Sequence, residues 1–99
     1  MKDESTISID RFGTKRYTLN GKAHRDDGPA VIFSAGNKWW FKHGTLHRLN
    51  GPAIETIDSE RLWYIDGKFY LHYKHYLEDV RKLISDEAFL ILVLTYGTE

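Results

Sequence analysis

The chain has 99 residues, of which 41% are hydrophobic and 28% are charged, and its 14 Lys and Arg residues balance its 14 Asp and Glu residues. This composition predicts one globular domain over residues 1–99 and argues against both a disordered chain and a dedicated nucleic-acid binder, which usually carries excess positive charge. The absence of cysteine excludes disulfides and thiolate metal sites, so side-chain packing must supply the stability.

The N-terminal residues and the apolar runs predict a cytoplasmic protein. Residues 1–5 are polar and acidic, unlike the start of a signal peptide. The longest apolar run, residues 88–94, has 7 residues, far fewer than the ~20 that a membrane-spanning helix needs. We therefore expect no membrane association, and the lack of cysteine is compatible with a reducing cytosol.

The first 70 residues are built on a 23-residue repeat. The segment GKAHRDDGPA at residues 21–30 returns as GTLHRLNGPA at residues 44–53, and a third copy begins at Gly67 but loses the His-Arg and Gly-Pro-Ala steps. A fixed period predicts repeated supersecondary units, and a degenerate last copy is typical of a cap.

Each repeat unit is predicted to form a β-hairpin, because β-branched and aromatic segments alternate with short turn segments. Residues 45–50 are expected to cross from one hairpin to the next, and Asn20-Gly21 and Asp66-Gly67 are tight-turn dipeptides. Consecutive hairpins would form a single elongated antiparallel sheet over residues 5–70 with open edges. The expected strand pairs are 6–10 with 15–19, 29–33 with 38–42, and 53–57 with 61–65.

Residues 71–97 are predicted to form a helical tail that covers the sheet. Apolar residues recur at helical spacing from Tyr73 onward, and Ser85 followed by two acidic residues is typical of a helix start. A second helix over residues 88–96 would be buried on several sides, either inside the domain or between subunits, because apolar residues surround it. A strand remains the alternative for residues 86–96. The predicted fold class is therefore α+β, an antiparallel β-hairpin repeat meander followed by two short helices.

The repeat resembles a known family. The pattern Tyr/Trp-x-x-x-Gly-x-x-His-Arg-x-x-Gly-Pro-Ala over residues 13–70 is similar to the MORN-type β-hairpin repeat, and more closely to the GxxHRxxGPA repeat proteins of phages and giant viruses. The chain departs from ordinary MORN units, which have a Gly-rich basic turn at this position. The resemblance implies a non-catalytic binding surface, and the phage association implies a phage protein that inhibits a host defence protein, for example as an anti-CRISPR protein.

The recurring His-Arg pairs admit two interpretations. We expect a structural role, because the pairs recur at a tight crossing where backbone carbonyls need donors, and direct ligand contact is the alternative. The residues with this expected structural role are Gly21, His24, Arg25, Gly28, Pro29, Gly44, His47, Arg48, Gly51, Pro52 and Gly67.

Sequence motifs for catalysis and cofactor binding are absent. The chain has no nucleophile elbow, phosphate loop or dinucleotide fingerprint, so we expect neither an enzyme nor a bound cofactor. His72 and His75 are three residues apart and could be joined by Glu78 or Asp79, but no established metal-binding spacing is present, and no metal site is expected.

The aromatic residues indicate the function most directly. Strand alternation places Tyr17, Trp40 and Trp63 on one face, and Trp39 and Tyr64 on the other. If the tail covers one face, the other exposes large aromatic side chains, which usually mark a partner surface. We therefore expect a non-catalytic interaction module that binds a host or viral protein. The expected contact residues are Trp39, Trp40, Trp63, Tyr64, Asp26 and Asp27.

Two other functions remain open. A homodimer mate could cover the exposed face, or copies could assemble into a structural component through the open sheet edges. Nucleic-acid binding is less favoured because the net charge is zero. It would use interleaved aromatic residues and a basic stripe formed by Arg11, Lys15, Arg16, Lys38, Lys42 and Arg61.

Overall fold

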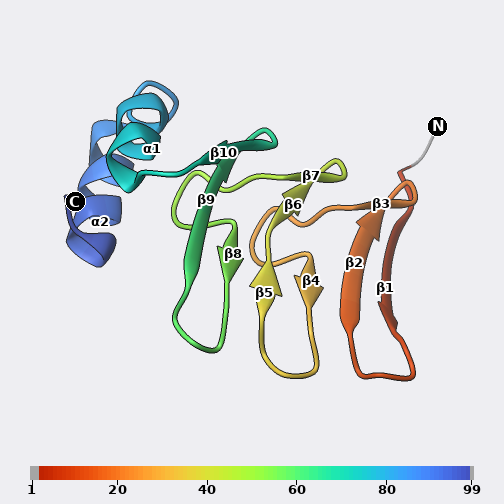
Figure 1. The fold of residues 1–99 in the computed structure, drawn as a ribbon. Helices are drawn as coiled ribbons and strands as arrows, with labels where there is room; N and C mark the ends of the chain where they lie inside the picture. Colours follow the sequence, from red (N-terminus) through yellow and green to blue (C-terminus); the bar gives the residue numbers. More distant parts are fainter. Residues whose placement is uncertain (1–2, 99) are drawn as a thin grey trace.

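The structure is a computed structural model that describes residues 3–98, and it shows an antiparallel sheet followed by two helices (Figure 1). This arrangement confirms the predicted α+β class. The strands are β1 Ser5–Ile9, β2 Lys15–Leu19, β3 Lys22–Ala23, β4 Val31–Ile32, β5 Lys38–Trp39, β6 Phe41–Lys42, β7 Thr45–Leu46, β8 Ile54–Glu55, β9 Arg61–Ile65 and β10 Lys68–Tyr70. The helices are α1 Tyr73–Val80 and α2 Asp86–Tyr96.

The main sheet follows the chain with no rearrangement of strand order. Its order is β1-β2-β4-β5-β8-β9-β10, and β3 pairs with β2. All of these pairings are antiparallel. The remaining strands, β6 and β7, pair with each other as a short flap. Each unit therefore contains two turns, which lie at opposite ends of the strands (Figure 1).

The short flap differs from the expected crossing. Thr45 and Leu46 form a strand that pairs back on β6, so only the residues after Leu46 cross to the next hairpin. The turn residues His43 and Gly44 both have positive φ, at 50° and 83°. Two successive positive φ values are those of a type I′ turn, whose twist matches that of a hairpin. Asn20-Gly21 and Asp66-Gly67 adopt the same conformation, which explains the glycine at the start of each repeat.

Backbone hydrogen bonds between neighbouring units recur at the spacing of the sequence repeat. The amides of Tyr17 and Trp40 donate to the carbonyls of Ala30 and Ala53, each at 2.7 Å. The amides of Gly44 and Gly67 donate to Ala23 and Leu46, each at 2.8 Å. Ala30 and Ala53 are fully buried, because they lie between adjacent strands where a larger side chain would separate the units.

The helical tail differs from its predicted bounds. α1 ends at Val80, and the next residues form a tighter turn in which Leu83 N donates to Val80 O. α2 then starts at Asp86 and is capped by Ser85, whose hydroxyl accepts a hydrogen bond from Ala88 N at 3.1 Å. The helical prediction for the second tail segment is thus confirmed over the strand alternative. No helix within residues 3–98 has the length and apolar character needed to cross a membrane.

The expectation that α2 is buried on several sides inside the domain is wrong. Only Leu92 is buried, whereas Leu90, Ile91 and Leu94 are 55%, 58% and 76% exposed. The helix packs against the core along one side, and one contact cannot bury apolar residues that surround the whole helix. An apolar outer surface of α2 is the result.

The core lies where the tail meets the last repeat unit. Trp63 is 7% exposed, and its ring centroid lies 4.5, 4.7 and 5.3 Å from those of Tyr73, Tyr76 and Tyr96. This burial corrects the expectation that the Trp63 ring lies on an accessible face. Tyr76 is fully buried, and its hydroxyl donates to the carbonyls of Arg48 at 2.7 Å and Gly51 at 3.1 Å.

Removal of the Tyr76 hydroxyl should destabilise the fold. Tyr76→Phe removes the one hydroxyl hydrogen that the carbonyls of Arg48 and Gly51 share, and the contact with Gly51 is buried. We therefore expect the free energy of unfolding to fall by about 1–3 kcal/mol in urea denaturation. Tyr73→Phe is the matched control, because its hydroxyl bonds the exposed carbonyl of Gly97 and its loss should lower that free energy by less than about 1 kcal/mol. Equal effects of the two variants would contradict this account of the tail.

Candidate functional site

One face of the sheet carries a continuous set of hydrophobic side chains. Strand register places Trp39, Ile54 and Leu62 on the same face, and Tyr64 lies two residues after Leu62. Ring contacts and strand pairing extend this set along the neighbouring strands. We call this surface the aromatic face, and it consists of Phe33, Trp39, Phe41, Leu46, Leu62, Tyr64 and Phe69.

The rings of the aromatic face pack against one another. Phe33 lies edge-on to Trp39 at a centroid distance of 5.0 Å, and Phe41 lies 6.2 Å from Trp39. Tyr64 and Phe69, paired across the Asp66-Gly67 turn, have centroids 5.3 Å apart. Such edge-on and tilted contacts restrict the rotation of the rings, so the surface is preorganised.

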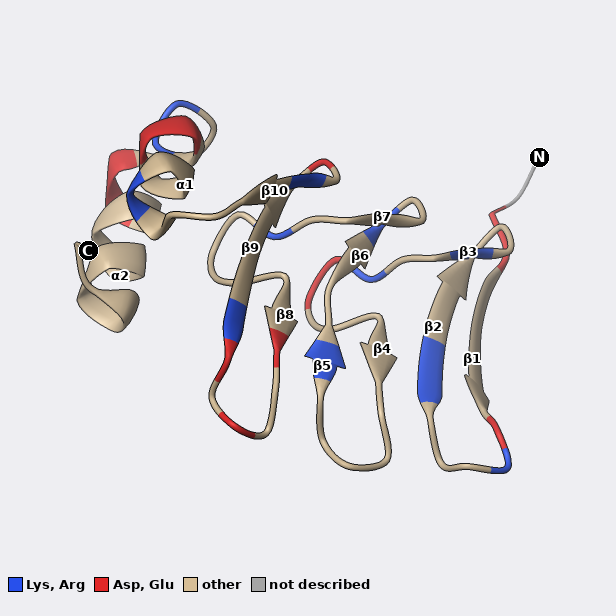
Figure 2. Cartoon of the chain, in the orientation of Figure 1, with Lys and Arg blue, Asp and Glu red and all other residues tan. Residues whose placement is uncertain are grey.

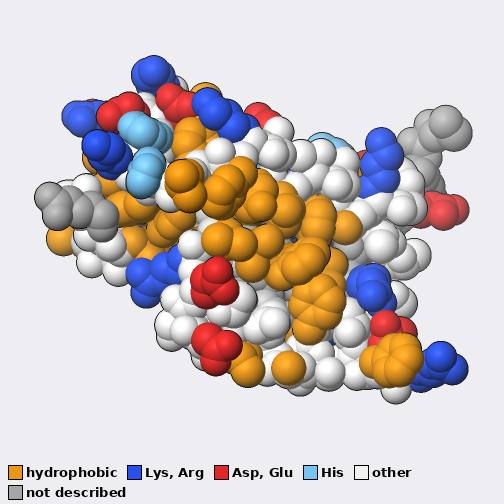
Figure 3. Space-filling view, viewed as in Figure 1, with side chains coloured by type: hydrophobic (Ala, Val, Ile, Leu, Met, Phe, Trp, Pro, Cys, Tyr) orange, Lys and Arg blue, Asp and Glu red, His pale blue; other side chains and the backbone are white. Residues whose placement is uncertain are grey.

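The helical tail leaves the aromatic face uncovered. α1 contacts β9 through Trp63 and β10 through Tyr70. The side chain of Trp63 points to the opposite face from Leu62 and Tyr64. Figure 3 shows an uninterrupted band of hydrophobic side chains across the visible face of the sheet. Phe69 is 44% exposed, and the other residues of the aromatic face are half-buried. A hydrophobic band of this kind on a protein surface usually marks a contact with another macromolecule.

On the opposite face, each complete repeat places an arginine over the aromatic residue of its own unit. The guanidinium carbon of Arg25 lies 4.0 Å from the Tyr17 ring centroid, and that of Arg48 lies 3.8 Å from the Trp40 ring centroid. Each arginine also donates through Nη1 to a proline carbonyl four residues later, at 3.2 Å and 3.0 Å respectively. Arginine suits this position because its planar fork stacks on a ring while its edge donates hydrogen bonds.

The glycine of each Gly-Pro-Ala step lies directly against the stacked arginine. A Cβ atom on Gly28 would lie 2.9 Å from Cζ of Arg25. On Gly51 it would lie 2.6 Å from Cζ of Arg48 and 2.8 Å from the Tyr96 hydroxyl. The motif therefore contains glycine because the arginine stack approaches the backbone too closely for any side chain.

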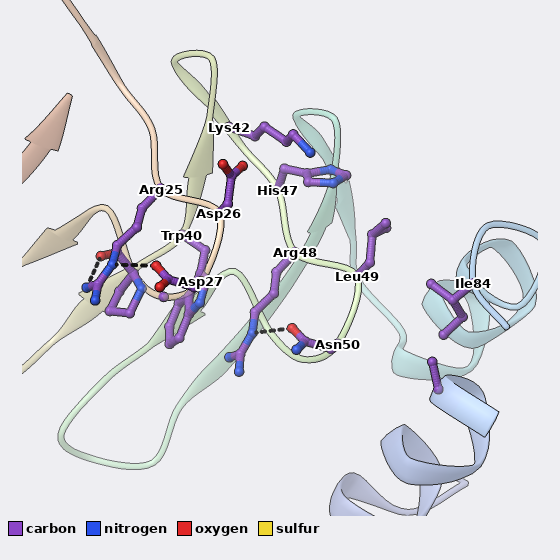
Figure 4. A pocket seen from close by; sticks show the side chains of 13 residues that line it. Arg25, Asp26, Asp27, Trp40, Lys42, His47, Arg48, Leu49, Asn50 and Ile84 are labelled. Carbon is purple, nitrogen blue, oxygen red and sulfur yellow. Dashed lines mark hydrogen bonds and ion pairs between the residues drawn. The ribbon is translucent and has the colours of Figure 1, made fainter. Parts of the chain in front are cut away.

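A groove of about 540 Å³ lies between the two His-Arg loops (Figure 4). Arg25 faces Asp27 with Nε and Oδ1 3.2 Å apart, and Arg48 Nη1 lies 2.9 Å from Oε1 of Glu55. Both guanidinium groups are therefore already paired with carboxylates, and the groove has no concentrated positive charge for an anionic ligand.

The structure separates the six predicted contact residues into three places. Trp39 and Tyr64 belong to the aromatic face. Trp40, Asp26 and Asp27 line the groove on the opposite side, and Trp63 is in the core. Phe33 and Phe69, which sequence reasoning missed, join the aromatic face. The signal for Phe69 was its position across the Asp66-Gly67 turn from Tyr64.

The repeat histidines link one unit to the flap of the next. Nδ1 of His24 accepts a hydrogen bond from His43 N at 3.0 Å, and Nδ1 of His47 accepts one from Asp66 N at 2.9 Å. Nδ1 of His47 also lies 3.1 Å from Oδ1 of Asp66. Burial lowers the pKa of His47 further than the nearby Asp66 carboxylate raises it, and Lys42 also lowers it.

The predicted basic stripe is interrupted by other side chains. Lys15, Lys38 and Arg61 lie on one face at equivalent ends of β2, β5 and β9 (Figure 2). Strand register places Glu55 between Lys38 and Arg61. Arg16 points to the other face and pairs with Asp10 at 2.8 Å. The six basic residues therefore do not form one surface, which disfavours a track for a phosphate backbone.

The histidines of the tail lie near each other without further ligands. The rings of His72 and His75 are edge-on with centroids 5.7 Å apart. Across residues 3–98, no three or more His, Asp or Glu side chains converge in a way that could hold a metal ion. Among the described residues, His72 and His75 therefore lack the further ligands that a zinc site requires.

The contact between Gly51 and Arg48 can be tested by substitution. Gly51→Ala should lower the free energy of unfolding by on the order of 1–3 kcal/mol, because the methyl group displaces both Arg48 and Tyr96. Gly28→Ala should have a smaller effect, since only the half-exposed Arg25 has to move. Neither glycine has a positive φ, so the comparison reports packing. Urea denaturation measures both values, and a larger effect of Gly28→Ala would be inconsistent with the stack.

The lowered pKa of His47 predicts that stability decreases in mild acid. The unfolded state binds a proton near the ordinary pKa of about 6.5 while the folded state resists it, so the free energy of unfolding falls as the pH drops below that value. In His47→Asn, the amide oxygen can replace the Nδ1 acceptor without titrating. Urea denaturation at pH about 7.5 and about 5.5 should show a smaller decrease for His47→Asn than for the wild type. An equal decrease would rule out His47 as the source.

Comparisons with known proteins identify no relative of this chain. No family model matches the sequence, and no curated protein or solved structure matches it.

Proposed function

We propose that this chain is a non-catalytic protein-interaction module whose aromatic face binds a partner protein. The observation that carries the proposal is the uncovered row of packed rings from Phe33 to Phe69, on a face that the helical tail leaves open. Aromatic residues dominate the energetic centres of protein interfaces, because they bury a large area and lose little conformational freedom.

The geometry of the aromatic face favours a partner with an apolar, broad contact surface. Neighbouring units contribute equivalent strands, so their ring clusters are separated by two strand spacings, roughly 10 Å. The ion pair of Arg16 with Asp10 lies at the border of this face, because Arg16 pairs with Val31 and Val31 with Trp39. An apolar centre with a polar rim is the common arrangement at protein interfaces.

The opposite side of the sheet supports a non-catalytic role. Its arginines are stacked on rings and bonded to proline carbonyls, and its histidines accept backbone amides. These side chains are engaged in holding adjacent units together, so they act as structural elements in this proposal. The resemblance of the repeat to phage proteins supports a narrower form of the proposal, in which a phage-encoded chain inhibits a defence protein in the host cytoplasm.

Substitution on the aromatic face should remove partner binding and retain the fold. We expect Phe69→Ala and Trp39→Ala to weaken capture of a bacterial lysate protein at least tenfold, as expected for truncation of an interface hot spot. Binding is then measured by titration with the purified captured protein. Phe12→Ala is the matched control, because Phe12 is a 69% exposed aromatic residue outside the aromatic face.

Thermal unfolding followed by circular dichroism separates binding from folding in these variants. The proposal requires that Phe69→Ala, whose ring is partly exposed, melts close to the wild type while binding is lost. Unchanged capture by both Phe69→Ala and Trp39→Ala would overturn the proposal. Equal loss with Phe12→Ala would show that exposed aromatic residues in general cause the capture.

A further inference from the structure

β1 is the open edge of the sheet. In the described part of the chain it pairs only with β2, whereas α1 and α2 pack at the β9–β10 end (Figure 1). Every residue of Ser5–Ile9 is exposed, including Ile7 at 63% and Ile9 at 68%. The stack of units is thus capped at one end only, although the end of a repeat stack normally needs a polar cap.

Alternate residues of β1 direct their backbone groups away from β2. Asn20 N donates to Glu4 O at 2.8 Å, and Asp10 N donates to Thr14 O at 3.0 Å. These two bonded pairs set the alternation of the antiparallel ladder, which places the even-numbered residues of β1 in hydrogen bonds to β2. The amide and carbonyl groups of Ser5, Ile7 and Ile9 therefore point outward, where a further strand would lie.

The sequence of β1 lacks the features that prevent edge pairing. Ser-Thr-Ile-Ser-Ile contains no charged residue, no proline and no glycine, and natural edge strands commonly use charges, proline or bulges to block another strand. β-branched residues also favour the extended conformation that pairing requires. Ile7 and Ile9 project to the same face, since they pair with Tyr17 and Lys15 of β2.

We infer that β1 pairs with β1 of a second copy of this chain, antiparallel and about a twofold axis, so that the two sheets become one. One register gives all three outward residues a partner, with Ile7 opposite Ile7 of the second copy and Ser5 opposite Ile9. This register gathers four isoleucines on one face and removes exposed apolar surface from water.

Charges at the ends of β1 favour a second copy as the occupant. Asp3 and Glu4 precede the strand, and Arg11 follows it. Antiparallel pairing brings the acidic end of one copy beside Arg11 of the other, twice in each dimer. Asp10 lies at the same end but is already paired with Arg16 at 2.8 Å. This inference is independent of the aromatic face, which remains open in the dimer.

Light scattering and sedimentation over a range of concentrations test the pairing. We expect the mass of the wild type to rise from 11.6 kDa toward twice that value. Ile7→Pro removes an outward amide that β2 does not use, so this variant should stay folded and monomeric at all concentrations. Leu94→Lys is the control for the apolar surface of α2 and should dimerise like the wild type.

Amide hydrogen exchange of the wild type gives an independent readout. The amides of Ser5, Ile7 and Ile9 should exchange more slowly as concentration rises, while those of Thr6 and Ser8, bonded to β2, should not respond. A constant mass of 11.6 kDa at the highest concentration would overturn the inference, even if a foreign peptide bound β1. Loss of the dimer in Leu94→Lys but not in Ile7→Pro would also overturn it and place the contact on α2.

Discussion

The stacking of a repeat arginine on the aromatic ring of its own unit is the interaction on which the rest of the sheet depends. Arg48 contacts the Trp40 ring and donates to the Pro52 carbonyl, so one side chain joins a strand to the loop that leads into the next unit. This contact explains why Gly51 has no side chain. The residues of the repeat therefore depend on one another. The glycine leaves space for the arginine, and the aromatic ring and the proline carbonyl are the groups that the arginine contacts.

The last unit ends the repeat by replacing that arginine with the helical tail. Leu71 stands at the position equivalent to Arg48, and the ring of Trp63 is covered by three tyrosines from the tail. Tyr76 reaches back to the carbonyls of Arg48 and Gly51. Tyr70 replaces the repeat histidine and donates to Asp79 at 2.6 Å, and burial together with this carboxylate raises the pKa of Tyr70 to about 12. The tail thus caps the sheet through polar contacts to backbone and side chain as well as through ring packing.

The two faces of the sheet have different roles as a consequence. One face is occupied by arginine stacks and by the tail, and this is the side that determines how units join. The other face carries packed rings that no element of residues 3–98 covers. Because the side chain of Phe69 is 44% exposed, it can serve binding on the second face with little effect on folding. The open edge at β1 is a third surface, and it would extend the sheet without hiding the rings.

The period, the hairpins, the α+β class and the cap at Ser85 could all be predicted from the sequence, because they follow from local turn chemistry, alternation and helix capping. The sequence also placed Trp39 and Tyr64 on one face, since strand alternation is a local property. The burial of Trp63 under the tail, the position of Trp40 under Arg48 and the exposure of Leu94 on α2 are known only from how the elements pack. Repeat equivalence makes the three aromatic positions look alike. What distinguishes Trp63 is its contact with tyrosines of the tail, and the tail carries no repeat from which those contacts could be predicted.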